Sequence, residues 1–188
     1  MAMLVAGVLL WTVVHLIPGP GREFRQKVIA ITGAGQYRGI FSLLLVAALL
    51  LIVFGWRSTM PRVVYQPPAW GHATALVLMP VSVFLFGAAR AKTRIKRLIR
   101  HPQLSGVILW SLAHLLANGD DRSLLLFGGL GLWASLEIAV INRRDREWIK
   151  PAAPSLAVEF RGLVITVAVV AILLYLHPIF AGVAVVAL

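Results

Sequence analysis

The chain contains no cysteine and few charged residues, and these absences exclude several kinds of protein. None of its 188 residues is cysteine, so it holds no disulfide and no thiolate nucleophile. Any bound metal must therefore be held by imidazole nitrogen or by carboxylate and carbonyl oxygen. Charged residues make up 13% of the chain, against about 25% in a typical soluble domain. This composition argues against a soluble protein.

The chain also lacks the sequence signatures of soluble enzymes. It has no GxSxG nucleophile elbow, no HExxH zinc motif, no P-loop and no dinucleotide-binding fingerprint after a strand. No polar segment is long enough to form a separate domain. We therefore expect a single domain that covers residues 1–188, and no reaction or substrate is assigned from such motifs.

What the chain has in abundance is apolar residues, which make up 60% of it and give a mean hydropathy of +0.87. A membrane-spanning helix needs ~20 mostly apolar residues to cross a hydrocarbon core of ~30 Å. We predict an all-α integral membrane bundle of about six transmembrane helices surrounded by lipid. Five spans are the alternative, if the last segment lies at the membrane interface. The apolar stretches cover residues 2–17, 39–56, 70–89, 103–118, 123–141 and 162–180, of which the first and fourth are short.

The basic residues predict the orientation of these spans. The first, third and fifth loops hold four, six and five lysines and arginines, whereas the second and fourth loops together hold three. Cytoplasmic loops are enriched in such cations, so we expect the odd loops in the cytoplasm and both termini outside. The same rule explains the basic run at 90–100, and we expect no nucleic-acid partner. We expect the first apolar stretch to be a retained helix, because no basic segment precedes it.

The fourth apolar stretch carries the most distinctive residue, His114. A titratable ring inside a membrane span is costly unless it has a partner or a function. Because successive residues of a helix are about 100° apart, five residues of this stretch form a mostly polar stripe on one helical face. Trp110 lies one turn before His114, where its ring could pack against a flat cofactor. Three roles stay open for His114: cofactor or metal ligation, an interhelical hydrogen bond, and proton relay. The stripe consists of Gln103, Val107, Ser111, His114 and Asn118.

The other histidines divide by their depth along the spans. His101 and His114 are ~20 Å apart along a continuous helix, so they cannot share one metal. His114, His72 and His177 could share the outer half of the bundle, although an interfacial or helix-end role is favoured for the last two. His15 and His101 could share the inner edge, and a haem between helices could also pair His15 with His114. Depth alone does not choose among these arrangements.

Several longer motifs are spread over residues 1–145. They are His15-Leu16-Ile17-Pro18, Gly35-x-Tyr37-Arg38-Gly39-x-x-Ser42, Trp70, Arg100-His101-Pro102-Gln103-Leu104-x-Gly106, Trp110, Ala113-His114-Leu115-Leu116-Ala117-Asn118-Gly119-Asp120 and Leu125-Leu126-Phe127-Gly128. Together these motifs resemble the NnrU family, with one departure at Gln36, which stands where glutamate is expected. That family is associated with bacterial denitrification and nitric-oxide metabolism, and it is similar to 15-cis-ζ-carotene isomerase, a membrane haem b protein.

This resemblance implies a bacterial inner-membrane, multi-pass protein in which haem b is ligated by His15 and His114. Trp110, Ser111 and Asn118 would surround the cofactor. The isomerase has a cysteine at the place of Ser111, so thiolate ligand exchange is unavailable here. A hydrophobic small molecule, a second copy of the chain or another membrane protein are the partners that such a protein would take.

A second resemblance gives a different cofactor. The run Arg100-His101-Pro102-x-Leu104-x-Gly106 is similar to the RHPxYxG motif of membrane isoprenylcysteine and phospholipid methyltransferases, with Leu104 in place of tyrosine. It implies S-adenosylmethionine binding by Arg100 and His101. The acidic pair of those enzymes is replaced by Asp145 and Glu147, which Arg146 separates. A third alternative is a non-enzymatic membrane protein that assembles or regulates denitrification complexes.

Overall fold

The computed structural model describes residues 1–18, 22–182 and 185, and the regular structure of these residues is helical apart from one isolated bridge between Val63 and Asp120. This confirms the predicted all-α class. The helices are α1 (Ala2–Leu16), α2 (Arg22–Thr32), α3 (Ala34–Ser58), α4 (Gly71–Arg90), the 3₁₀ helix η1 (Arg94–Arg97), α5 (Pro102–Ala117), α6 (Asp121–Ser123), the π-helix η2 (Leu124–Gly128), α7 (Gly129–Arg144) and α8 (Leu156–Ala181).

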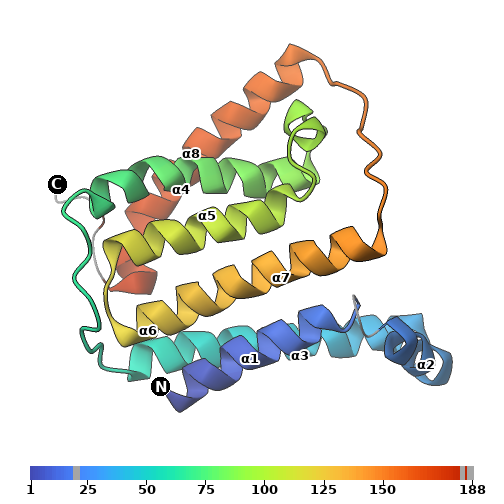
Figure 1. Cartoon of the computed structure of the whole chain (residues 1–188), viewed down its shortest axis with the longest axis horizontal. Coiled ribbons are helices and arrows are strands. Elements are labelled where there is room, and N and C mark those ends of the chain that lie inside the picture. Colours follow the sequence, from blue (N-terminus) through green and yellow to red (C-terminus); the bar gives the residue numbers. More distant parts are fainter. Residues whose placement is uncertain (19–21, 183–184, 186–188) are drawn as a thin grey trace.

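Five long helices lie side by side, and the sixth crosses them obliquely (Figure 1). The pair α1 and α3 forms one side of the bundle, α7 follows, and α5 and α4 form the other side, where α8 packs against α4. The helices α2 and η1 and the connection from α7 to α8 all lie at one end of the bundle. The three basic loops therefore lie together at that end (Figure 1).

Among the residues that the structure describes, four helical segments are long and apolar enough to cross a membrane: Ala34–Ser58, Gly71–Arg90, Asp121–Arg144 and Leu156–Ile179. In the most apolar part of each segment, only 6–28% of the residues are buried inside the protein. Most of their apolar surface therefore faces outward. Such a surface suits lipid. Helices α1 and α5, with 15 and 16 residues, are apolar but shorter. They correspond to the two stretches that we expected to be short.

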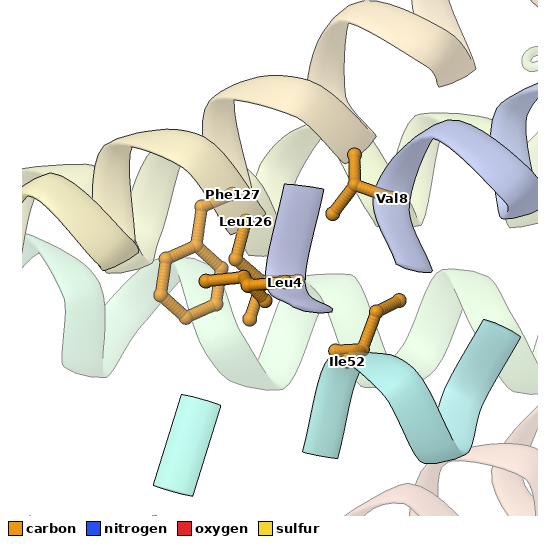
Figure 2. Close-up of a cluster of buried hydrophobic side chains, with 5 residues drawn as sticks. All are labelled: Leu4, Val8, Ile52, Leu126 and Phe127. Carbon is orange, nitrogen blue, oxygen red and sulfur yellow. The ribbon is translucent and has the colours of Figure 1, made fainter. Parts of the chain in front are cut away.

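Close helix contacts depend on glycine. A Cβ atom at Gly7 of α1 would lie 2.8 Å from the backbone nitrogen of Ile52 in α3, and one at Gly71 of α4 would collide with the carbonyl oxygen of Leu116 in α5. Small residues allow such approaches between membrane helices. Beside the first contact lies a core of Leu4, Val8, Ile52, Leu126 and Phe127 (Figure 2).

The helix boundaries differ from the sequence predictions in three places. Residues 22–32, expected as a loop, form α2, and α3 begins at residue 34 rather than 39. Helix α8 begins at residue 156 rather than 162; it continues through Pro178 to Ala181, and its C-cap Gly182 has a left-handed φ of 78°. Glycine adopts that conformation at little cost, so it is the glycine, and not the proline, that ends the helix.

Candidate functional site

His114 lies in the last turn of α5, where its Nδ1 hydrogen-bonds to the backbone. Its Nδ1 lies 2.8 Å from the carbonyl oxygen of Trp110. A carbonyl oxygen only accepts hydrogen bonds, so Nδ1 donates its proton and Nε2 of the neutral ring keeps a lone pair. Histidines that bind metals are held in this way, by a hydrogen bond from the second nitrogen. The tautomer suits ligation through Nε2.

One face of the His114 ring is covered by Phe127. The two rings are stacked, with centroids 4.2 Å apart and planes 19° apart, and Trp110 contacts both rings with centroid distances of 5.0 and 4.7 Å. Phe127 belongs to the π-helix η2. The wider turn of a π-helix changes the direction of the side chains, and such segments are frequent at functional sites. The irregular turn thus supplies an aromatic wall of the His114 site.

Two cavities meet at His114, Asn118 and His177. The smaller, of about 200 Å³, lies between α4, α5 and α8, and the larger, of about 420 Å³, lies between α3, α5, η2 and α8. Ligand sites of drug-sized molecules span about 300–1,000 Å³ and have mostly apolar walls. Leucine, valine, alanine, methionine and tryptophan side chains contribute much of the lining of both cavities.

The polar residues of the larger cavity include Arg57, Asp120 and Arg122. The guanidinium of Arg122 lies 4.3 Å from the ring centre of Trp56 and 3.4 Å from an Asp120 carboxylate oxygen. Arg57 and Arg122 are two of the three cations in the second and fourth loops. Cations are scarce at this end of the bundle, and two of them border the cavity of His114.

The segment between α3 and α4 closes the end of α5. The backbone nitrogens of Val64 and Tyr65 donate to the carbonyl of Gly119, at 2.8 and 3.0 Å. The Tyr65 hydroxyl donates a hydrogen bond of 2.7 Å to the carbonyl oxygen of Asn118 and also contacts the carbonyl oxygen of Leu115. Burial, and to a smaller extent the negative charge of Asp120, raise the pKa of Tyr65 above its usual value. These bonds fix the turn that carries His114.

His15 has the same local arrangement as His114 but different surroundings. Its Nδ1 lies 2.9 Å from the carbonyl oxygen of Trp11, and its ring centre lies 4.4 Å from Trp11, 4.8 Å from Trp133 and 6.0 Å from Phe41. It lines neither cavity at His114. The sequence carries the pattern W-x-x-x-H at both places, a repeat that the sequence interpretation missed. Ligation of one haem by His15 and His114 stays a prediction.

The polar stripe of α5 is divided between two neighbours. Ser111 is buried against α7, where a Cβ on Gly131 would lie 2.9 Å from its own Cβ. Asn118 lines both cavities and donates 2.9 Å to the carbonyl of His114. Gln103 is exposed, which corrects the expectation that the whole stripe faces the interior. The stripe is longer than the surface that α5 buries.

Arg100 and His101 join the start of α5 to the segment after α7. Arg100 donates to the carbonyls of Asp145 and Glu147, at 2.8 and 2.9 Å, and Nε2 of His101 lies 2.8 Å from the side-chain oxygen of Asn142. Arg100 thus lies beside the segment that carries Asp145 and Glu147. The hydrogen bonds of Arg100 and His101 hold the start of α5 against the end of α7 and the segment that follows it. S-adenosylmethionine binding by Arg100 and His101 stays a prediction.

His72, His114 and His177 share the smaller cavity, as their depth along the spans allowed. Nε2 of the exposed His72 lies 3.1 Å from the carbonyl oxygen of Val185. Within residues 1–18, 22–182 and 185, no group of three or more His, Cys, Asp or Glu side chains is arranged to hold a metal ion. The three imidazoles therefore line one cavity.

Comparison with known proteins identifies the family. Searches of curated proteins and of solved structures find no significant match. The sequence matches a family described as NnrU protein over residues 3–185, which includes both W-x-x-x-H helices and extends past residue 145, where the resemblance in the sequence weakens. Because this match covers nearly all of the 188 residues, the chain belongs to the NnrU family.

Proposed function

We propose that this NnrU-family protein binds haem b in the cavities beside His114, and that Nε2 of His114 would hold its iron. The observation that carries the proposal is an imidazole with a fixed tautomer at the junction of two largely apolar cavities. A haem b site combines a ligand for the iron, such as imidazole, with apolar walls and a polar edge for the carboxylates. His114, its aromatic neighbours and the arginines of the larger cavity fit these three needs.

The walls of the larger cavity support a flat, mostly apolar ligand. Trp110 and Phe127 present ring surfaces next to His114, and aromatic faces pack well against a planar ring system. At the polar edge, Arg57 and Arg122 would pair with the two carboxylates that haem b carries. Asp120 is held by Arg122 and by the backbone nitrogen of Ser123 at 3.0 Å, which leaves Arg57 as the cation more accessible to a ligand.

The cellular role that we propose follows the family. Haem iron would supply redox chemistry, nitric-oxide binding or isomerase-like chemistry, in keeping with the association of the family with denitrification. We propose a multi-pass protein of the bacterial inner membrane with six spans, in which α1 and α5 cross as short helices. A thinner bilayer around short spans is a modest cost. The basic loops at one end of the bundle support a cytoplasmic location for that end.

An absorption spectrum of the protein purified in detergent tests the proposal. We expect a Soret band in the wild type, before or after reconstitution with haem b, and its loss in His114→Ala. His72→Ala is the matched control, because His72 lines the smaller cavity but has a ring nitrogen beside the Val185 carbonyl. A folded wild type without a Soret band after reconstitution would contradict haem binding. A band that His114→Ala leaves unchanged would contradict the assigned ligand.

A further inference from the structure

We infer that His177 of α8 supplies the second imidazole of the His114 site, on the opposite side of the bound ligand. This inference rests on the haem-binding function proposed above and adds the ligand pair. The sequence offers three candidates for the second imidazole, namely His15, His72 and His177. They differ in the cavities that they line, and that difference carries the argument.

His177 borders the same space as His114 from a different helix. Both residues, together with Asn118, line both cavities. The two imidazoles thus face the same space from two different helices, α5 and α8. A ligand in that space borders both of them, as a pair of histidine ligands requires.

His177 continues the inward face of α8, on which Gly162, Thr166 and Val170 are buried or partly buried at helical spacing. Residues 171–175 are exposed, whereas Leu176 and His177 are partly buried. An imidazole that turns inward from an apolar, membrane-type helix is a candidate for a functional site, because lipid disfavours polar groups. Helix α8 crosses the bundle obliquely and brings its C-terminal part beside the ends of α4 and α5 (Figure 1). The tilt of α8 thus brings His177 to the cavity.

The two other candidates fit less well. His72 lines only the smaller cavity, is exposed, and has Nε2 beside the carbonyl oxygen of Val185. His15 lines neither cavity and lies among Trp11, Trp133 and Phe41. His177 is thus the histidine that shares both cavities with His114.

Electron paramagnetic resonance and absorption spectra of the ferric, haem-loaded full chain test the inference. We expect the wild type to be six-coordinate and low-spin, with two imidazole ligands. His177→Ala should retain haem through His114 but lose the low-spin signal and become five-coordinate and high-spin. Imidazole added to the buffer should restore the low-spin signal. His15→Ala should leave the wild-type spectrum unchanged, because His15 lines neither cavity.

The outcomes separate this inference from the proposed function. A wild type that binds no haem contradicts both. A low-spin wild type that His177→Ala leaves low-spin, while His15→Ala makes it high-spin, overturns the inference and supports the ligand pair that the family resemblance implies. A high-spin wild type also overturns it. If His177→Ala does not fold in detergent, His177→Gln keeps a polar side chain of similar size and gives the same test.

Discussion

The two W-x-x-x-H helices, α1 and α5, have the same local chemistry and different environments. In each, a tryptophan carbonyl one turn earlier accepts the Nδ1 proton and the tryptophan ring contacts the imidazole. The ring of His15 is enclosed by Trp133 and Phe41, whereas the ring of His114 has Phe127 on one face and cavities beside it. A local motif sets the tautomer of a histidine, but tertiary packing decides whether a ligand has room.

Unpaired polar atoms lie near both sites, with more of them near His15. In the part of the chain that the structure describes, the indole nitrogens of Trp11 and Trp133, the Tyr37 hydroxyl and a carboxylate oxygen of Glu137 are buried without a hydrogen-bond partner in the helices around His15. On the His114 side the same holds for the Ser111 hydroxyl and Nε of Arg122. Buried polar atoms of this kind usually bind ordered water. The clearer difference between the sites is therefore the pair of cavities, which His114 lines and His15 does not.

The largest expected effect comes from the aromatic wall. Phe127 is 5% exposed and stacks on His114, so Phe127→Ala should lower the free energy of unfolding by about 3 kcal/mol through the cavity that it leaves. Phe41, at the edge of His15, is partly buried, and Phe41→Ala should cost about 1 kcal/mol, the value of an aromatic pair. Equilibrium unfolding in detergent measures both variants.

The same two variants test whether the sites are distinct in function. Phe127→Ala should weaken haem retention in the folded fraction, because His114 loses the ring that holds it, and Phe41→Ala should not. Equal losses of haem in the two variants would mean that His15 and His114 belong to one site. In that case the contrast between α1 and α5 would be wrong.

Helix contacts give the next largest effect. Gly71→Ala would press a methyl group onto the carbonyl of Leu116 in α5, and Gly7→Ala would press one onto the backbone of α3. We expect each to cost about 2 kcal/mol, as overpacking typically does. Gly71→Ala displaces the helix of His114 itself, whereas Gly7→Ala presses on Ile52 at the wall of the larger cavity, so Gly71→Ala should lower haem affinity more. Thermal unfolding and haem titration separate the two effects.

Gly87 of α4 provides the control for both glycine variants. A Cβ at Gly87 would have no atom within 4 Å, so Gly87→Ala tests the change of residue without a collision. We expect it to leave the unfolding temperature and haem affinity close to wild type. A loss of haem affinity in Gly7→Ala as large as in Gly71→Ala would show that α1 also positions the ligand, as the pairing with His15 requires.

Much of the architecture follows from the sequence, because it depends on apolar length and on cations. The apolar stretches predicted the six main helices, including the short first and fourth, and the basic loops lie at one end of the bundle. The importance of His114 also followed from one titratable ring in an apolar segment. These features depend on local composition, which a sequence contains in full.

The rest depends on contacts between distant segments. Nothing in the local sequence of η2 predicts a π-helical turn that stacks Phe127 on His114. The depth of His177 allowed a shared cavity with His114, but only the packing of α8 places it there. Helix α2 was missed because its charged residues resemble a loop, and the exposure of Gln103 depends on where α4 and α7 end. The motif W-x-x-x-H could have been found, but its two copies would have suggested equivalent sites.

The smallest expected effect concerns two tyrosines, one near each histidine helix. The Tyr65 hydroxyl holds the end of α5 by donating to backbone carbonyls, and Tyr65→Phe should cost about 1 kcal/mol, the usual net value of a hydrogen bond. The Tyr37 hydroxyl, near His15, has no hydrogen-bond partner among the residues that the structure describes. Tyr37→Phe should therefore change the unfolding temperature little.

The pH dependence of stability distinguishes the titratable phenol of Tyr65 from a phenyl ring, which only packs. Because burial and Asp120 raise its pKa in the folded protein, the unfolded chain loses the phenol proton first, at about pH 10. The stabilisation by Tyr65 is complete below that pH and is lost as the pH rises through the folded pKa. Unfolding temperatures measured from pH 8 to pH 11 should therefore fall less steeply in Tyr65→Phe than in the wild type. An equal slope in the two proteins would mean that folding leaves the pKa of Tyr65 unchanged, and that the outer end of α5 is open to solvent.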